Sequence, residues 1–281
     1  MATLVTSVTH GCVPPFPNKP ALSIDDNLLK QIEKRGYLLV ATEDDYPPFE
    51  YLINGKPVGF DNELLDRLRK RVPFEIRQEI IPWQGLLPGV IKGQYDVALT
   101  AVGITDERSK LLDFTMPISE SSISYIKRKE DTSIQGLKDL AGKTVGVQEG
   151  GVSLAAIPDL AATLKEYNGT LGQVKQYRGF AEAYQDLLSG KLDAVLNNIV
   201  SLSVLVDEKP AIFALGERVS RKSYAAWAVK KGNQSLLNML NSFLRSLREK
   251  GELHQLQKKW LKISFEHLPT QPLLPGNRPI L

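Results

Sequence analysis

Cysteine and histidine are scarce in this sequence, and the few that occur are poorly placed for chemistry. Cys12 is the single cysteine, so it forms no internal disulfide and has no second cysteine with which to build a zinc site. The three histidines, His10, His254 and His267, stand near the two ends of the chain, away from any nucleophile or suitably spaced metal ligand. We also find no P-loop and no metal-binding motif. We therefore expect neither a cofactor nor a metal ion.

Long apolar runs and blocks of one charge are also missing. No stretch of about 18 or more apolar residues occurs, which argues against a membrane-spanning helix, and no apolar signal-peptide core opens the chain. An exported protein is therefore expected here in its mature form, with the signal peptide removed. The 35 basic and 32 acidic residues are interspersed and leave a net charge of +3, so we expect no nucleic-acid partner.

What the chain does contain is an alternation of strand and helix patterns. Residues 1–23 are rich in proline and lack periodicity, which predicts an irregular N-terminal arm. The apolar run 37–41 predicts a buried strand, and helix and strand patterns then alternate as far as residue 100, as a parallel α/β sheet requires. The same rhythm resumes over residues 136–196. We therefore predict two α/β lobes, each with its own core.

Two extended stretches and one long helical region lie outside this alternation. Residues 113–127 lie between the two α/β segments, and residues 224–229 form a second β-prone run far downstream. Two crossings of the chain would make the first lobe discontinuous. The apolar positions between residues 235 and 262 follow a helical period and predict one long helical region that packs back on the first lobe.

Three segments at strand ends are suited to ligand binding. Residues 42–50 follow the carboxyl end of a predicted strand, where open α/β sheets place their ligands. Thr105 is a candidate helix N-cap, and Arg108 can bind both oxygens of a carboxylate beside free backbone N–H groups. The turn 148–153 contains two glycines that let backbone amides approach an anion. Taken singly, a proline-rich turn, a solvated arginine and a structural turn are the ordinary alternatives.

Taken together and in this order, these segments make the chain resemble a known family. The sequence is similar to the periplasmic solute-binding proteins of amino-acid ABC importers, the polar amino-acid group called family 3, over roughly residues 36–262. The matching stretches are residues 46–50, 58–61, 96–99, 104–108, 113–115, 137–143 and 192–195.

The resemblance implies a type II periplasmic binding fold, in which two doubly wound α/β lobes are joined by two hinge strands. It places lobe one at residues 24–118 and 225–281 and lobe two at residues 119–224. It also implies a monomer in the periplasm that closes over an amino acid or a derivative and is then recognised by the permease of an ABC importer. Such a protein needs no cofactor.

The family's ligand site can be carried over residue by residue. The arginine that binds the ligand carboxylate corresponds to Arg108, and it is supported by amides and hydroxyls of the preceding stretch. Tyr46 and Trp83 correspond to walls around the ligand side chain, with Glu43 nearby as a polar contact. The other positions that the resemblance implies are Thr100, Ala101, Gly103, Gln148, Gly151, Val152 and Asn198.

Asn198 departs from the family's pattern. The family usually has an aspartate here that holds the α-ammonium of the ligand, whereas an asparagine supplies no compensating charge. Two interpretations follow. Either Glu43 or Glu149 supplies the missing charge from another direction, or the ligand is a derivative with a substituted nitrogen, such as an opine.

Two other functions stay open. A dehydratase of the cyclohexadienyl type resembles these proteins and would need a buried acid in the cleft, for which Glu43 and Glu149 are the candidates. A ligand-sensing module of a signalling protein has the same lobes, but the sequence shows neither a membrane-spanning segment nor an effector domain. A binding protein without enzymatic activity is the function that we predict.

Overall fold

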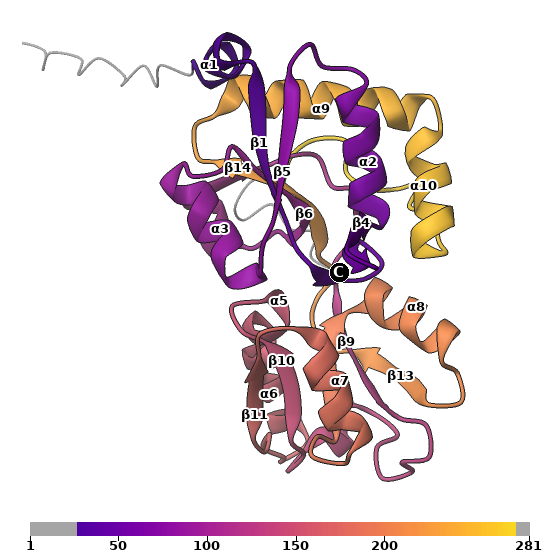
Figure 1. Ribbon diagram of the computed structural model, residues 1–281. Helices are drawn as coiled ribbons and strands as arrows, with labels where there is room; N and C mark the ends of the chain where they lie inside the picture. Colours follow the sequence, from indigo (N-terminus) through magenta and orange to yellow (C-terminus); the bar gives the residue numbers. More distant parts are fainter. Residues whose placement is uncertain (1–26, 274–281) are drawn as a thin grey trace, which may run out of the picture.

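The chain forms two α/β lobes, drawn one above the other in Figure 1. The computed structural model describes residues 27–273. The arm predicted for residues 1–23, with Cys12, therefore lies outside the described residues, as does the tail from residue 274. The mixed α/β class predicted from the sequence is confirmed, because each lobe contains one sheet flanked by helices.

The sheet of the upper lobe has six strands, of which β6 and β14 are buried on both faces. All seven residues of β6 are buried, as are six of the seven residues of β14, which explains why both segments are almost uniformly apolar. β1 pairs in parallel with β5 and β6, whereas β14 runs antiparallel to β6 and β7. In order of pairing the strands are β5 (Glu75–Ile80), β1 (Tyr37–Thr42), β6 (Val97–Gly103), β14 (Tyr224–Lys230) and β7 (Leu112–Phe114), with β8 (Ser119–Glu120) paired to β14.

Helices cover both faces of this sheet (Figure 1). α3 packs on β1, β6 and β14, and α2 packs on β6; α9 packs against α1, and α10 packs against α9 and α2. The helices of this lobe are α1 (Leu28–Arg35), α2 (Phe60–Arg69), α3 (Trp83–Lys92), α4 (Asp106–Ser109), α9 (Gln234–Glu249) and α10 (Glu252–Leu261). None of the helices within residues 27–273 is both long and apolar enough to cross a membrane.

The lower lobe repeats the same order of strand pairing. Its central strand β10 pairs in parallel with β11 and β12, and β9 then runs antiparallel to β12 and β13. The strands in order are β11 (Val174–Tyr177), β10 (Val145–Gln148), β12 (Ala194–Asn198), β9 (Ile123–Arg128) and β13 (Phe213–Arg218). The helices are α5 (Val152–Ala155), α6 (Ile157–Glu166), α7 (Phe180–Leu188) and α8 (Ile199–Glu208), with a 3₁₀ turn at Leu137–Leu140.

Two chain crossings connect the lobes, one leading from β8 to β9 and the other from β13 to β14. They are hydrogen-bonded to each other: the backbone N–H of Ser121 donates to Ser223 O over 2.8 Å, and the Ser223 hydroxyl donates to Ser121 O, also over 2.8 Å. Val219 N donates to Ile123 O over 2.7 Å on the lower side of the same region. The two crossings therefore form one narrow hinge.

The structure corrects the helical region predicted between residues 235 and 262. It is two helices, α9 and α10, because Gly251 has the left-handed backbone conformation at φ 72°, which ends the helical path between them. Three elements were not predicted: α8, β13, and a small antiparallel sheet next to the cleft. This small sheet consists of β2 (Asp45–Tyr46), β3 (Glu50–Ile53) and β4 (Lys56–Val58).

Two carboxyl groups, Glu50 and Asp61, are fully buried near each other behind this small sheet. Trp227 donates its indole N–H to Asp61 Oδ1 over 2.7 Å, and a hydrogen bond links the Glu50 and Asp61 side chains, which requires a proton on one of them. Burial and the neighbouring Asp61 raise the pKa of Glu50 well above its usual range, and burial raises the pKa of Asp61 to about 6. The pair therefore holds a proton at neutral pH.

This buried pair makes the stability of the protein depend on pH. Both pKa values are raised by folding, so above about pH 5 the folded protein binds more protons than the unfolded chain, and its free energy of unfolding falls as the pH rises. One extra bound proton gives a slope of up to about 1.4 kcal/mol per pH unit. We expect a smaller slope for Glu50→Gln, measured by urea unfolding at several pH values, and no change for the exposed Glu75→Gln. If the free energy of unfolding changed equally with pH in the wild type, Glu50→Gln and Glu75→Gln, the proton shared by Glu50 and Asp61 would be contradicted.

Candidate functional site

The candidate site lies where the carboxyl ends of the parallel strands of the two lobes face each other. From the upper lobe, residues 43–46 follow β1, and α4 follows β6. From the lower lobe, the turn 149–151 follows β10, and α8 follows β12. Side chains from these four strand ends meet across the junction, as the rule for open α/β sheets predicts.

A carboxyl group and an amide connect the lobes in the interior of the junction. Gln148 donates its side-chain N–H to Glu43 Oε1 over 2.7 Å, and both residues are buried. Burial raises the pKa of Glu43 to about 8, although the bond from Gln148 opposes this rise. Glu43 is therefore largely protonated at neutral pH in this arrangement, and a cationic group placed beside it would favour its ionised form, with the proton released to solvent.

Arg108 makes the second polar connection between the lobes. Its backbone N–H is bound by the hydroxyl of Thr105, the predicted N-cap, over 3.1 Å, which fixes the start of α4. Its guanidinium donates to Gly103 O over 2.8 Å and, across the junction, to Gly150 O over 3.0 Å. Gly150 has φ +67°, a conformation that favours glycine and that sets the direction of this turn.

The surroundings of the Arg108 guanidinium are partly apolar. The Trp83 ring lies with its centre 4.9 Å from the Arg108 Cζ atom, in the range of a cation–π contact. Burial lowers the pKa of Arg108 to about 10, so the group stays charged at neutral pH. Among the described residues, the Arg108 guanidinium contacts two carbonyl oxygens and one ring. It therefore still has N–H groups available for a carboxylate.

Tyr46 forms an aromatic wall beside these groups. Its ring is buried and stacks on Phe49 from its own lobe, at 5.2 Å between ring centres, and on Phe180 from the lower lobe, at 6.1 Å. Burial and the neighbouring Glu43 raise the pKa of the Tyr46 hydroxyl, whereas the Asn198 side chain opposes this rise. The hydroxyl is therefore near both Glu43 and Asn198.

Asn198 is fully buried and serves as the N-cap of α8. Its Oδ1 atom accepts from Val200 N over 2.8 Å, and its amide N–H groups lie 3.4 Å from Ser121 Oγ and from Glu120 O in the hinge. The oxygen atom of this side chain thus already accepts one hydrogen bond from the backbone of its own helix, which leaves one lone pair and no negative charge for an ammonium group.

The remaining predicted residues differ in what they present to the junction. Thr100 is fully buried, and its hydroxyl has no partner among the described residues, whereas the Ala101 side chain packs in the apolar core. A Cβ atom on Gly103 would lie 2.5 Å from a methyl carbon of Val152, so the two lobes touch here. Gly151 donates its backbone N–H to Gln148 O over 3.1 Å, which closes the turn after β10.

Sequence reasoning missed several contacts across the junction. The carbonyl of Gly150 was not predicted as a partner of Arg108. Gln84 donates its side-chain N–H to Arg178 O over 3.0 Å, and Ala181 N donates to Asp45 Oδ2 over 3.3 Å. No local sequence signal indicates such pairs, because the partners belong to different lobes. Asp45 does lie within the predicted segment 42–50, and its position after a strand end was the one usable clue.

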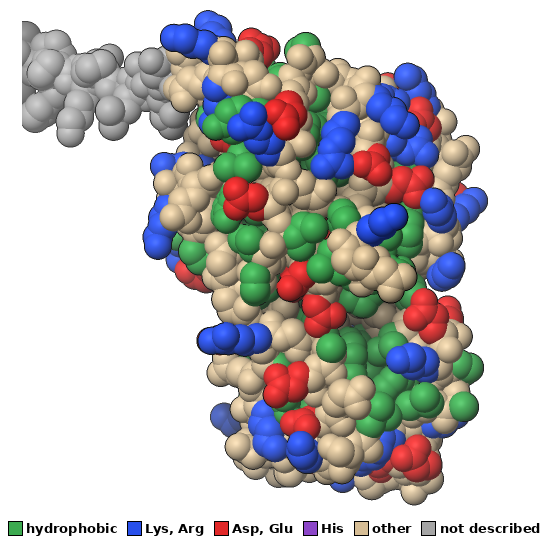
Figure 2. Space-filling view, in the orientation of Figure 1, with side chains coloured by type: hydrophobic (Ala, Val, Ile, Leu, Met, Phe, Trp, Pro, Cys, Tyr) green, Lys and Arg blue, Asp and Glu red, His purple; other side chains and the backbone are tan. Residues whose placement is uncertain are grey.

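A hollow of about 510 Å³ opens from the junction to the surface. Acidic side chains outnumber basic ones in its lining, and acidic side chains are also visible where the two lobes meet in Figure 2. The residues that line it are Glu43, Asp44, Asp45, Pro82, Trp83, Gln84, Glu149, Arg178 and Gly179. With one arginine against four acids and an indole ring, this opening favours a cationic group.

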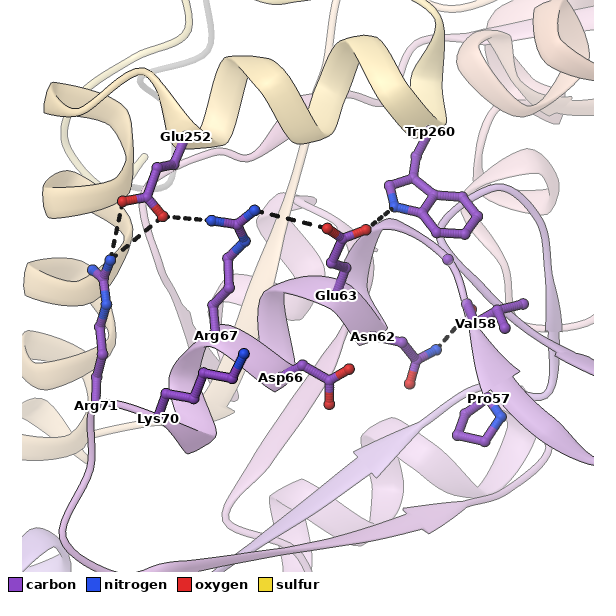
Figure 3. A pocket seen from close by; sticks show the side chains of 11 residues that line it. Pro57, Val58, Asn62, Glu63, Asp66, Arg67, Lys70, Arg71, Glu252 and Trp260 are labelled. Atoms are coloured by element: carbon purple, nitrogen blue, oxygen red, sulfur yellow. Dashed lines mark hydrogen bonds and ion pairs between the residues drawn. The ribbon is translucent and has the colours of Figure 1, made fainter.

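A second hollow, of about 610 Å³, lies on the outer face of the upper lobe between α2 and α10 (Figure 3). Its charged groups pair with one another: Arg67 lies 2.5 Å from Glu252, Arg71 lies 3.2 Å from Glu252, and Glu63 accepts from the indole N–H of Trp260 over 2.7 Å. Because these charges already have partners, the groove offers a ligand less than the junction does.

Within residues 27–273, no group of three or more His, Cys, Asp or Glu side chains is arranged to hold a metal ion.

The chain matches known proteins over most of its length. Residues 38–263 match the model of the bacterial extracellular solute-binding proteins, family 3. The chain is also 32% identical over 242 residues to the L-cystine-binding protein TcyJ of Escherichia coli K12, which covers 84% of this chain and 86% of that protein.

Solved structures agree with this match. The substrate-binding protein AbpA of an amino-acid ABC transporter of Streptococcus pneumoniae, bound to L-arginine, superposes with a TM-score of 0.74 at 29% identity, over 83% of this chain and 98% of that one. An ancestral amino-acid-binding protein, a precursor of cyclohexadienyl dehydratase, superposes with a TM-score of 0.74 at 28% identity, over 83% and 99% of the two chains.

Proposed function

Because the chain belongs to the bacterial extracellular solute-binding proteins of family 3, we propose that it captures an amino acid between its lobes and delivers it to the permease of an ABC importer. The observation that carries this proposal is the pair of opposite groups at the junction, the Arg108 guanidinium and the Glu43 carboxyl, each bonded to the other lobe. A zwitterion supplies the opposite charge to both. The protein would act outside the cytoplasm as a monomer, with lobe one at 24–118 and 225–281 and lobe two at 119–224.

Each predicted ligand contact then has a role. Arg108 binds the α-carboxylate, with the backbone of Thr100, Ala101 and Gly103 and the turn at Gly151 and Val152 alongside. Glu43 supplies the charge that Asn198 lacks and binds the α-ammonium, and Gln148 orients its carboxyl group. Tyr46 and Trp83 form the walls. This assignment favours the first of the two interpretations of Asn198 over an N-substituted ligand such as an opine.

The acidic opening indicates which side chain the ligand carries. Glu149 and Asp44 line the hollow that leads outward from Glu43 and Trp83. L-Arginine, present in the Streptococcus pneumoniae structure, and L-cystine, named for the Escherichia coli relative, both carry a second cationic nitrogen beyond the α-ammonium. We propose a ligand of this kind. A thermal-shift screen of amino acids tests the proposal, since a ligand at 100 times its Kd adds about 2.7 kcal/mol of stability.

A second candidate function is a cyclohexadienyl dehydratase. The observation that favours it is the buried Glu43 carboxyl, whose pKa is raised to about 8, as a general acid requires. One structural relative is a precursor of such an enzyme, although its own description is that of a binding protein. Proton NMR of a cyclohexadienyl carboxylate incubated with the protein distinguishes the two: aromatic product that disappears in Glu43→Gln would establish the enzyme, and an unchanged substrate would exclude it.

The role of Arg108 can be tested by truncation. Arg108→Ala removes the partner of the ligand carboxylate in a site from which water is largely excluded, so we expect L-arginine to bind more weakly by on the order of 3 kcal/mol, over a hundredfold. Isothermal titration calorimetry measures this. Arg69→Ala, on the exposed face of α2, is the control and should bind as the wild type does. Wild-type affinity in Arg108→Ala would remove this residue from the site.

The pKa of Glu43 predicts how binding depends on pH. Its value of about 8 means that an ammonium must displace a proton to pair with the carboxylate. We therefore expect the affinity for L-arginine to rise with pH, by up to about tenfold per unit, and to level off above pH ~8. Glu43→Gln should bind weakly with no such rise. If Glu149→Gln abolishes the pH dependence instead, the charge comes from Glu149.

Asn198→Asp tests whether an ammonium lies within reach of this position. Aspartate caps a helix as well as asparagine does, so α8 should keep its start, while the added charge would strengthen binding of L-arginine by roughly 1.5–3 kcal/mol. Competition calorimetry with L-arginine and with its N-substituted opine measures both affinities. A gain for neither ligand would show that the nitrogen lies away from residue 198, and a gain for the opine alone would contradict the free α-ammonium.

A further inference from the structure

The amino end of α7 has no cap from its own lobe. Its N-cap residue is Gly179, which has no side chain to accept from the first backbone N–H groups of the helix. Such groups carry a partial positive charge and have no partner within the helix. This end of α7 points to the upper lobe, where β2 packs against it.

Asp45, from the upper lobe, supplies the missing cap. Its Oδ2 atom accepts from Ala181 N over 3.3 Å, and the N–H of Phe180 also bonds to this carboxylate. A Cβ atom on Gly179 would lie 2.8 Å from the same oxygen, so the carboxylate approaches as closely as it does because residue 179 is glycine. The geometry is that of an ordinary N-cap, except that the cap and the helix belong to different lobes.

Two further contacts hold the same end of the helix. The ring of Phe180, the first residue of α7, stacks on Tyr46, and the carbonyl of Arg178 accepts from the Gln84 side chain over 3.0 Å. Carboxylate, ring and amide of the upper lobe thus surround the first turn of α7. None of these three contacts involves the Arg108 guanidinium, where the ligand carboxylate is expected.

We propose that Asp45 is a latch for lobe closure: it caps α7 when the lobes are together and so stabilises the closed arrangement whatever ligand is bound. The proposal rests on the proposed function, in which closure follows ligand capture. When the lobes separate, the first amides of α7 lose this cap and must bond to water. Asp45 is therefore a positioning residue, and it affects affinity through the ratio of closed to open protein.

A disulfide-trapping rate tests the latch without any ligand. In a Cys12→Ser background, Gly103→Cys and Val152→Cys place two thiols on opposite lobes at a point where the lobes touch, so they can react when the lobes are closed. The rate at which oxidised glutathione joins these two cysteines in a disulfide is then proportional to the fraction of protein that is closed, even where that fraction is small. Because a cap replaced by alanine changes a helix equilibrium about fivefold, we expect a rate about fivefold lower with Asp45→Ala.

Two companion variants make the result specific. Asp45→Asn keeps a capping oxygen at the same distance from the backbone and should trap at close to the wild-type rate, since an amide oxygen accepts from a helix N–H as a carboxylate does. Asp66→Ala removes the same charge from the upper lobe at an exposed position on α2, where the carboxylate pairs with Arg69, and should also leave the rate unchanged. Equal rates for Asp45→Ala and the wild type would overturn the latch. The latch would also be overturned if the trapping rate fell as far in Asp45→Asn as in Asp45→Ala, because such a result would indicate an effect of the charge instead of the cap.

The affinity for L-arginine, measured in protein without the added cysteines, provides a second test of the latch. We expect Asp45→Ala to raise the Kd by about the same fivefold factor and Asp45→Asn to leave it within twofold. A wild-type affinity in Asp45→Ala would overturn the latch. If the wild-type protein does not bind L-arginine, the proposed ligand is wrong, and the trapping rates still decide whether Asp45 controls closure.

Discussion

The whole arrangement depends on the two chain crossings that hydrogen-bond to each other between the lobes. Ser121 and Ser223 exchange two bonds of 2.8 Å, so the crossings behave as one ribbon about which the lobes can rotate but not slide. Asn198 is connected to this ribbon through its amide, and it also caps α8. The hinge and the lower half of the candidate site therefore share a residue. This gives a physical reason for a neutral side chain at position 198 in addition to any effect on the ligand.

The two ionisable groups in the junction explain why a ligand would favour closure. In the present arrangement Arg108 and Glu43 each reach the opposite lobe through a neutral partner, the carbonyl of Gly150 and the amide of Gln148. A carbonyl compensates poorly for the removal of water from the Arg108 charge, and Glu43, whose bonded partner is a neutral amide, is largely protonated at neutral pH. A zwitterion between the lobes supplies a carboxylate to one group and an ammonium to the other. It therefore interacts more favourably with the closed form than with the open form, and this difference in affinity is what shifts the population.

Much of the fold could be predicted from the sequence, because it depends on local patterns. The apolar runs that became β1, β6, β10 and β14 are buried on both faces, and such strands have a clear signal. The small sheet β2–β4 could not be predicted in this way, since its strands are only two to four residues long and prolines stand within and between them. Helix α8 follows directly on β12, so its apolar residues merged with those of the strand.

The site was predicted unevenly for a related reason. Arg108, Glu43 and Gln148 stand in motifs at strand ends, and those ends meet at one junction in this fold. Their partners across the junction are decided by how the lobes approach each other, which depends on tertiary contacts between segments far apart in the sequence. The carbonyl of Gly150 and the cap from Asp45 are of this kind. A backbone carbonyl, in particular, is carried by every residue and leaves no trace in the sequence.

The contacts across the junction fall into two groups with different consequences for specificity. In the proposed function, those at Arg108 and Glu43 would change when a ligand enters, so their contribution would depend on the chemistry of that ligand. Those that Asp45 and Gln84 make at the amino end of α7 hold backbone groups that every closed form would present. A bond of the second kind would raise the affinity for all ligands by one factor and leave their ratios unchanged. Under the two proposals together, selectivity among ligands would therefore rest on Arg108, Glu43 and the acidic opening, while the strength of capture could be adjusted separately at α7.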